Sequence, residues 1–188
     1  YILRESYNSE FYIAKRLTVL SREYSNISYE EEISNIEEKL GCIFNKEQKQ
    51  AIETSFNSNF SIITGGPGTG KTKVIKAITS LYKIINNLSR KDLLESLVLL
   101  APTGRASKRM SMESGLPSYT IHRFLKWQKE ENTFLINEEN KSDAKLVIID
   151  EASMLDNDLF YNLLLGLKAN CKIIMIGDYN QLPSVGAG

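Results

Sequence analysis

The chain has 188 residues, of which 42% are hydrophobic and 24% are charged, a composition that excludes fibrous and low-complexity proteins. Its 23 basic and 23 acidic side chains balance at pH 7, so affinity for a polyanion must come from a local patch of cations. No apolar stretch is long enough to span a bilayer and no secretory leader pattern opens the chain. We therefore expect a cytoplasmic protein with no membrane partner, and free thiols at Cys42 and Cys171.

Residues 1–40 predict a helical lead-in from an upstream domain, distinct from the main domain at residues 41–188. Ser28 and Glu31 fit a capping box that starts a second helix, and Gly41 fits its end. One helical face in the first part of this lead-in is marked by Ile13, Leu17, Leu20 and Tyr24. The chain starts at Tyr1 and stops at Gly188 within a glycine-rich turn, which indicates a piece of a longer protein.

The main domain alternates apolar runs with helical patterns, which predicts an α/β fold with a mostly parallel sheet flanked by helices. The predicted strands are Phe60–Thr64, Leu97–Ala101, Leu146–Asp150 and Lys172–Gly177. The predicted helices span about residues 70–87, 103–113, 119–128 and 156–168. The polar segment Asn132–Ala144 predicts a hairpin or a mobile loop.

A glutamine precedes the first strand by about one helix length. Gln48 fits position N3 of a capping box that begins at Asn45. Its amide also offers the one donor and one acceptor that an adenine edge needs. The residue chemistry alone favours the cap and leaves the adenine role open.

A complete P-loop pattern follows the first strand and opens the next helix. It reads Gly65, Gly66, Pro67, Gly68, Thr69, Gly70, Lys71 and Thr72. Glycines let successive N–H groups face phosphate oxygens, and the helix N-terminus attracts the same anion. We expect Lys71 to reach the β- and γ-phosphates and the Thr72 hydroxyl to ligate Mg²⁺.

Two carboxylates and an amide complete the predicted catalytic set. Asp150 ends a strand and is the expected Mg²⁺ ligand, while Glu151 is the expected base for the attacking water. Without the P-loop, the same pair would equally fit two solvated acids at a strand end. Gln181, in the turn after the last strand, is placed to sense the γ-phosphate, and Asp178 to organise that turn.

Five segments occur in the order of the superfamily 1 helicase motifs, and the set resembles the RecD-like DNA helicases, which include the α subunit of exodeoxyribonuclease V. The segments are GGPGTGKT, APTGRASKRM, TIHRFL, VIIDEASMLD and GDYNQLPSVGAG. FNKEQKQAI resembles the family's Q motif, which favours adenine recognition by Gln48. The resemblance implies that residues 41–188 are the first of two RecA-like motor domains, with ATP and Mg²⁺ bound between them. The second domain, with its arginine toward the γ-phosphate, is absent here.

The resemblance also implies movement along single-stranded DNA from 5′ to 3′, separation of duplex junctions, and partners in a recombination or repair complex. By the same resemblance, the backbone of the strand would lie on Pro102, Thr103, Gly104 and Arg105, with Lys108 and Arg109 one turn further on. A hydroxyl, amides at a helix start and nearby cations suit phosphate, although the cations also fit a solvated helix face. His122 is a further candidate for the DNA path or for a packing role, and Trp127 for base stacking or for a core.

Two other classes of function compete with a motor. A small-molecule kinase or GTPase also uses a P-loop, but residues 45–48 read Asn-Lys-Glu-Gln rather than a guanine-reading Asn-Lys-x-Asp. The second alternative is a subunit without motor activity, whose P-loop binds nucleotide only to hold an assembly together. The intact Lys71, Asp150 and Glu151 argue against such a degenerate site. The sequence shows no second acidic cluster to support nuclease activity.

Overall fold

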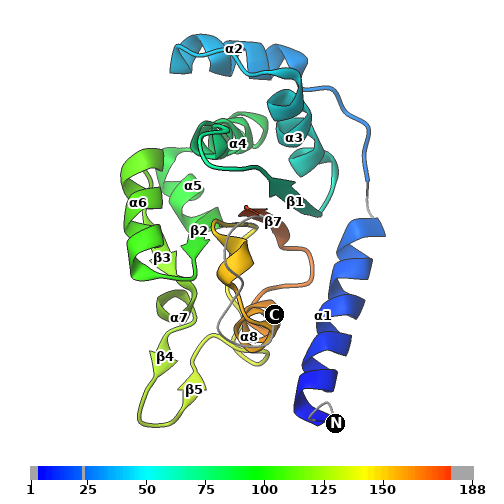
Figure 1. Ribbon diagram of the computed structural model, residues 1–188, viewed down its shortest axis with the longest axis vertical. Helices are drawn as coiled ribbons and strands as arrows, with labels where there is room; N and C mark the ends of the chain where they lie inside the picture. Colours follow the sequence, from blue (N-terminus) through cyan, green and yellow to red (C-terminus); the bar gives the residue numbers. More distant parts are fainter. Residues whose placement is uncertain (1–3, 23, 179–188) are drawn as a thin grey trace.

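The computed structural model describes residues 4–22 and 24–178, and its centre is a five-stranded parallel sheet (Figure 1). The strands lie in the order β1 (Phe60–Thr64), β7 (Lys172–Gly177), β6 (Leu146–Ile149), β2 (Leu97–Ala101) and β3 (Ser118–Thr120). All four pairings between neighbours are parallel. The four predicted strands are confirmed, although β6 ends one residue before Asp150, and β3 was not predicted.

Helices cover both faces of this sheet, which confirms the predicted α/β architecture. The first face carries α2 (Glu30–Leu40), α3 (Lys46–Asn57), α4 (Lys71–Ile85), α5 (Arg90–Ser96) and α6 (Gly104–Ser114). The second face carries α1 (Arg4–Arg22), α7 (Ile121–Phe124) and α8 (Asn157–Leu165). The central strands therefore need apolar side chains on both of their sides.

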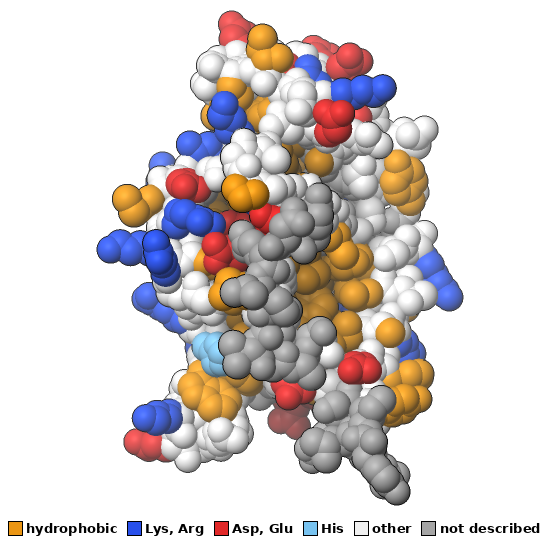
Figure 2. Space-filling model, in the orientation of Figure 1, with side chains coloured by type: hydrophobic (Ala, Val, Ile, Leu, Met, Phe, Trp, Pro, Cys, Tyr) orange, Lys and Arg blue, Asp and Glu red, His pale blue; other side chains and the backbone are white. Residues whose placement is uncertain are grey.

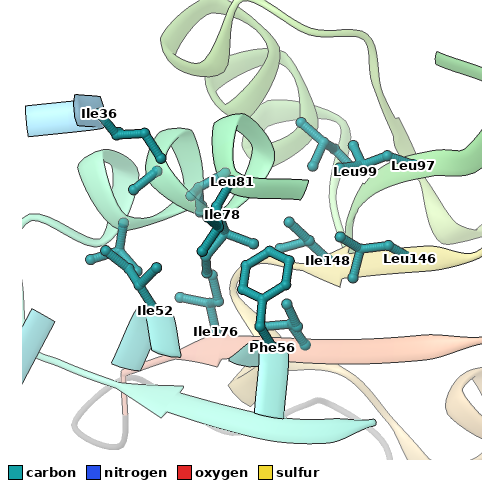
Figure 3. Packing of buried hydrophobic residues seen from close by; sticks show 14 of the residues in the cluster. Ile36, Ile52, Phe56, Ile78, Leu81, Leu97, Leu99, Leu146, Ile148 and Ile176 are labelled. Carbon is teal, nitrogen blue, oxygen red and sulfur yellow. The ribbon is translucent and has the colours of Figure 1, made fainter. Parts of the chain in front are cut away.

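The central strands supply those side chains in alternation. In β6, Leu146 and Ile148 belong to the core on the α4 face, while Val147 and Ile149 belong to the core on the α8 face. Figure 3 shows the first of these cores, where residues of α2, α3 and α4 meet the sheet. This double burial explains why the strands read as continuous apolar runs.

The N-terminal helices pack directly on the domain that follows. Leu20 of α1 lies in the core with α8, and the Arg16 guanidinium donates to the main-chain carbonyl of Lys168. Ile33 and Ile36 of α2 lie in the opposite core, next to α4. The predicted division between residues 1–40 and 41–188 thus crosses both cores, and its position stays a prediction.

Three local predictions in this region have different outcomes. Gly41 ends α2 in the left-handed conformation at φ 61°, as predicted. The capping box at Ser28 is wrong, because α2 begins after Tyr29 and has no side-chain cap. Tyr24 does not continue the helical face, because it pairs with Ser58 in an isolated bridge.

The helix predicted over residues 119–128 is wrong. Only α7 is helical there, and β4 (Trp127–Gln128) pairs with β5 (Thr133–Phe134) in an antiparallel hairpin. Lys126 adopts φ 56°, which stops a right-handed helix. The hairpin predicted for Asn132–Ala144 is therefore centred on earlier residues. Helix α5 was not predicted, although Ser89 and Asp92 form a capping box at its start.

The two cysteines differ in burial. Cys42 and Cys171 are free, and Cys171 is buried. Burial raises the pKa of the Cys171 thiol to about 12. In the part of the chain that the structure describes, no helix has the length and apolarity to traverse a membrane.

Candidate functional site

The P-loop joins β1 to α4 at the carboxyl edge of the sheet. Gly68 and Gly70 adopt φ 75° and 83°, a region that a side chain would strain. A Cβ on Gly65 would stand 2.6 Å from Thr69 Oγ1. The Thr69 hydroxyl itself donates to the Gly66 carbonyl at 2.9 Å. These glycines therefore meet steric demands of the turn, in addition to exposing N–H groups.

The lysine and threonine that follow the loop begin α4. Lys71 Nζ donates to the carbonyls of Gly65 and Gly66, at 2.6 and 2.9 Å, across the mouth of the loop. Thr72 Oγ1 donates to Glu113 Oε2 at 2.7 Å. Both side chains lie at the helix N-terminus, where the helix dipole favours an anion.

The carboxylate pair lies at the end of β6, opposite the P-loop. Asp150 is 7% exposed, and its Oδ1 accepts from the Glu151 N–H at 2.9 Å. Burial raises the pKa of Asp150, and the hydrogen bond from Glu151 and the charge of Arg109 oppose that rise. A buried carboxylate with few donors of its own is well suited to a cation.

Glu151 has an unusual backbone for a residue with a side chain. Its φ of 53° and ψ of 38° are left-handed, and it begins the 3-10 turn Ala152–Met154. The cost of that conformation is on the order of 1–3 kcal/mol, and such residues cluster at functional sites. This left-handed backbone lies directly after the expected Mg²⁺ ligand, Asp150.

Two residues of α6 complete the site, and one of them was missed. Arg109 Nη2 lies 2.7 Å from Glu151 Oε1 and 3.8 Å from Asp150 Oδ2. Glu113, one turn later, accepts from Thr72. Arg109 was expected only beside DNA, and Glu113 was not predicted. The signal was the four-residue spacing from Arg105 to Arg109 to Glu113, which is one helical face.

A cavity of about 410 Å³ brings these groups together. Its lining residues include Gly68, Thr69, Gly70, Lys71, Thr72, Arg109, Glu113, Asp150 and Glu151. Mg²⁺ binds one or two carboxylates and completes its shell with water and phosphate oxygens. One buried carboxylate and one hydroxyl across the cavity from it therefore fit that ion.

Gln48 makes the predicted capping box with Asn45 and also contacts the P-loop. Gln48 N–H donates to Asn45 Oδ1, and Gln48 Oε1 accepts from Asn45 N–H. The side-chain NH₂ group donates to the Thr69 carbonyl at 2.8 Å. The adenine role of Gln48 stays a prediction. Gln181 lies outside the described residues.

The expected DNA contacts fall in two places. Pro102 follows β2, and the Thr103 hydroxyl caps α6 by accepting from Ala106 N–H. Gly104 and Arg105 form the exposed first turn of that helix. Figure 2 shows basic side chains gathered along the edge where Figure 1 draws α6, beside acidic ones.

His122 lies apart from that first turn, on α7. Its ring packs near Trp127 and Phe134, with centroids 6.3 and 5.9 Å away. Trp127 is 37% exposed, so its side chain is neither buried in the core nor fully surrounded by solvent. His122 and Arg105 line two different cavities.

Residues 48–187 match the family model of the AAA domain. The subunit RecD of the RecBCD enzyme from Buchnera aphidicola is 35% identical in an alignment of 156 residues, gaps included, that covers 73% of this chain and 25% of that protein. The ATP-dependent RecD2 DNA helicase of Deinococcus radiodurans is 33% identical over 147 residues, 76% of this chain and 19% of that protein. The chain thus spans about a quarter or less of these relatives.

A solved structure agrees with the fold. The Pif1 helicase of Candida albicans superposes with a TM-score of 0.54 at 25% identity, over 76% of this chain and 34% of that one. The parallel sheet, the P-loop after its first strand and this likeness confirm the predicted RecA-like fold of P-loop NTPases.

Proposed function

This chain belongs to the AAA domain family and to the RecD-like superfamily 1 helicases, and on that premise we propose that it is the first motor domain of an ATP-dependent DNA helicase. In this proposal residues 41–188 form the RecA-like domain, and residues 1–40 lead into it. ATP binds at the P-loop, between this domain and a second motor domain that supplies the arginine toward the γ-phosphate.

One observation carries the proposal: four side chains from two distant segments converge on one cavity. Lys71 and Thr72 come from the start of α4, and Asp150 and Glu151 from the end of β6. Phosphoryl transfer needs little beyond such positioning and charge neutralisation. A glycine-rich turn without a ligand would not require a buried carboxylate opposite it.

Each residue then has a defined task. The P-loop amides and Lys71 bind the phosphate chain, with Lys71 exchanging its two loop carbonyls for phosphate oxygens. Thr72 and Asp150 hold Mg²⁺, which neutralises charge on the phosphate oxygens when bound. Glu151 accepts a proton from the attacking water. Gln48 reads adenine and Gln181 senses the γ-phosphate.

The strand of DNA lies across the start of α6. Pro102, Thr103, Gly104 and Arg105 contact its phosphates, and His122 borders the path further along. Phosphate contacts carry no base information, as a motor that steps over any sequence requires. The proposed substrates are single-stranded DNA, travelled 5′ to 3′, and duplex junctions. Subunits of a recombination or repair complex are the proposed protein partners.

The test is turnover by the full-length protein against ATP, GTP and small-molecule phosphate acceptors, with and without single-stranded DNA. We expect ATP hydrolysis that single-stranded DNA stimulates, and unwinding of a duplex with a 5′ tail in preference to a 3′ tail. Lys71→Ala abolishes both activities and leaves the circular dichroism spectrum unchanged. Phosphate transfer to a small molecule would favour a kinase, and nucleotide binding without turnover would favour an assembly subunit.

A further inference from the structure

Helix α6 touches both of the groups that the proposed reaction uses. Its first turn, capped by Thr103, is the expected DNA contact. Arg109 and Glu113 follow at four-residue spacing from Arg105 and face the cavity. At 1.5 Å per residue, about 6 Å of helix separate Arg105 from Arg109, and about as much again separates Arg109 from Glu113. A displacement of the first turn is therefore carried to both residues by one helix.

The contact between α6 and the expected base, Glu151, is an ion pair. Arg109 Nη2 lies 2.7 Å from Glu151 Oε1, and the side chain of Glu151 is 17% exposed. The backbone of Glu151 is left-handed, and its side chain reaches Arg109 of α6. Arg109 is the only residue with a described ion pair to this carboxylate in residues 4–22 and 24–178. The position of the expected base is thus set by α6 as well as by its own strand.

The contact between α6 and the expected Mg²⁺ ligand Thr72 is a hydrogen bond that Thr72 donates. Glu113 is an acceptor when ionised, so the Thr72 hydroxyl gives it the hydrogen at 2.7 Å. The lone pairs of the Thr72 oxygen remain for a cation. Partners of this kind orient a metal ligand and increase its basicity. Glu113 therefore accepts a hydrogen bond from the same hydroxyl that is expected to bind Mg²⁺.

We propose that Arg109 and Glu113 are positioning residues through which DNA contact at the start of α6 controls ATP hydrolysis. This inference rests on the proposed function. DNA that binds the first turn fixes α6 against the sheet. Arg109 then holds Glu151 in line for the attacking water, and Glu113 holds Thr72 for the metal. Neither residue exchanges a proton or an atom with the substrate.

A second cavity beside the first supports this role. Its volume is about 750 Å³, and Arg105, Arg109, Glu113 and Glu151 all line it. The Arg109–Glu151 pair and Glu113 thus stand between this cavity and the nucleotide cleft, since they line both. A group bound near Arg105 lies next to the catalytic carboxylate without entering the nucleotide cleft.

The test for Arg109 uses ATPase assays of the full-length protein with and without single-stranded DNA. Arg109→Ala is expected to lower DNA-stimulated kcat by about tenfold or more, as for the loss of other outer-shell partners. The stimulation ratio falls, and the KM for ATP stays within about twofold. Arg109→Lys keeps the charge and restores part of the ratio. Lys91→Ala, an exposed cation on α5, is the control and keeps the wild-type ratio.

The test for Glu113 is a binding measurement that needs no turnover. Fluorescent ATP-analogue affinity is measured with Mg²⁺ and with EDTA. Glu113→Ala is expected to weaken binding about tenfold with Mg²⁺ and by less than twofold with EDTA. Met112→Ala, its exposed neighbour on α6, leaves both affinities unchanged. Equal losses with and without Mg²⁺ would contradict the role of Glu113.

The proposed function and the coupling through α6 are tested by different outcomes. If the wild-type protein shows no DNA-stimulated ATPase, the proposed function itself fails. If the wild type is stimulated and Arg109→Ala is stimulated to the same ratio, only the coupling through α6 fails. Single-stranded DNA affinity, measured by fluorescence anisotropy, is expected to stay within about threefold in Arg109→Ala. A loss of affinity that accounts for the whole loss of stimulation would mean that Arg109 acts only by holding DNA.

Discussion

The side-chain NH₂ group of Gln48 donates a 2.8 Å hydrogen bond to the main-chain carbonyl of Thr69, which joins α3 to the P-loop. The same side chain closes the capping box with Asn45. A Cβ on Gly70 would stand 2.6 Å from the Gln48 nitrogen, so the loop and the glutamine fit closely. One residue thus supports a helix start and the nucleotide loop together.

Removing Gln48 should therefore have two separable effects. Gln48→Ala is expected to cost about 1 kcal/mol of stability through the lost hydrogen bond from the Asn45 N–H, and also to weaken ATP binding. Asn45→Ala removes the other hydrogen bond of the same capping box without touching Thr69, so it is the matched control. Urea unfolding and fluorescent-nucleotide titration measure the two effects. Equal nucleotide affinity in both variants would show that the Gln48 contact with the loop, and any contact with adenine, is unimportant.

Replacing the expected base should separate binding from chemistry. Glu151→Gln keeps the length and a hydrogen-bond acceptor for Arg109 but cannot accept the proton of water. We expect ATP affinity within about threefold of wild type and a kcat at least 10²-fold lower, from the contribution of a general base. Single-turnover hydrolysis and equilibrium binding test this. Wild-type turnover in this variant would assign the base to another residue.

The buried Lys172 should make stability depend on alkaline pH. Its Nζ donates to the carbonyls of Ser55, Phe56 and Ser58 at the end of α3. Burial lowers its pKa from 10.5 to about 8. Between those values the unfolded chain still holds a proton that the folded chain has released, so this group increases stability as pH rises from 8 toward 10.5.

A comparison with Lys172→Met isolates that contribution. The variant loses the three carbonyl contacts and should be less stable at pH 7, by about 1–3 kcal/mol for unpaired buried carbonyls. Between pH 7.5 and 9.5 the advantage of the wild type should grow, on the order of 1 kcal/mol. Urea denaturation at the two pH values measures both. An advantage that is constant with pH would contradict the lowered pKa.

The two cysteines should differ in reactivity. Cys42 is partly exposed, whereas Cys171 is fully buried with a pKa raised to about 12. The thiolate is the reactive form, and at pH 8 a pKa of about 12 leaves about one Cys171 in 10⁴ ionised. Labelling with a maleimide followed by peptide mass spectrometry should therefore modify Cys42 in the native protein and Cys171 only in guanidinium. Native labelling of Cys171 at a similar rate would mean that α8 and β7 open readily.

The sequence alone predicted the parts of this protein that local chemistry dictates. Buried parallel strands need apolar side chains on both faces, so the central strands β2, β6 and β7 could be recognised as apolar runs, and the edge strand β1 as a shorter one. The P-loop could be recognised in the sequence because glycine is the residue that readily adopts φ near 80°, as Gly68 and Gly70 do. The capping box at Asn45 could be recognised in the sequence because its hydrogen bonds join residues three positions apart.

Tertiary structure decided what depends on contacts distant along the chain. The Thr72–Glu113 and Arg109–Glu151 contacts join residues 41 and 42 positions apart, and no local pattern states such a pairing. The short β3 and the hairpin around Trp127 replaced a predicted helix, because pairing with β2 and the positive φ of Lys126 outweigh weak helical periodicity. The sequence motifs determined which groups the site contains. The packing of α6 against the sheet determined which of those groups are in contact.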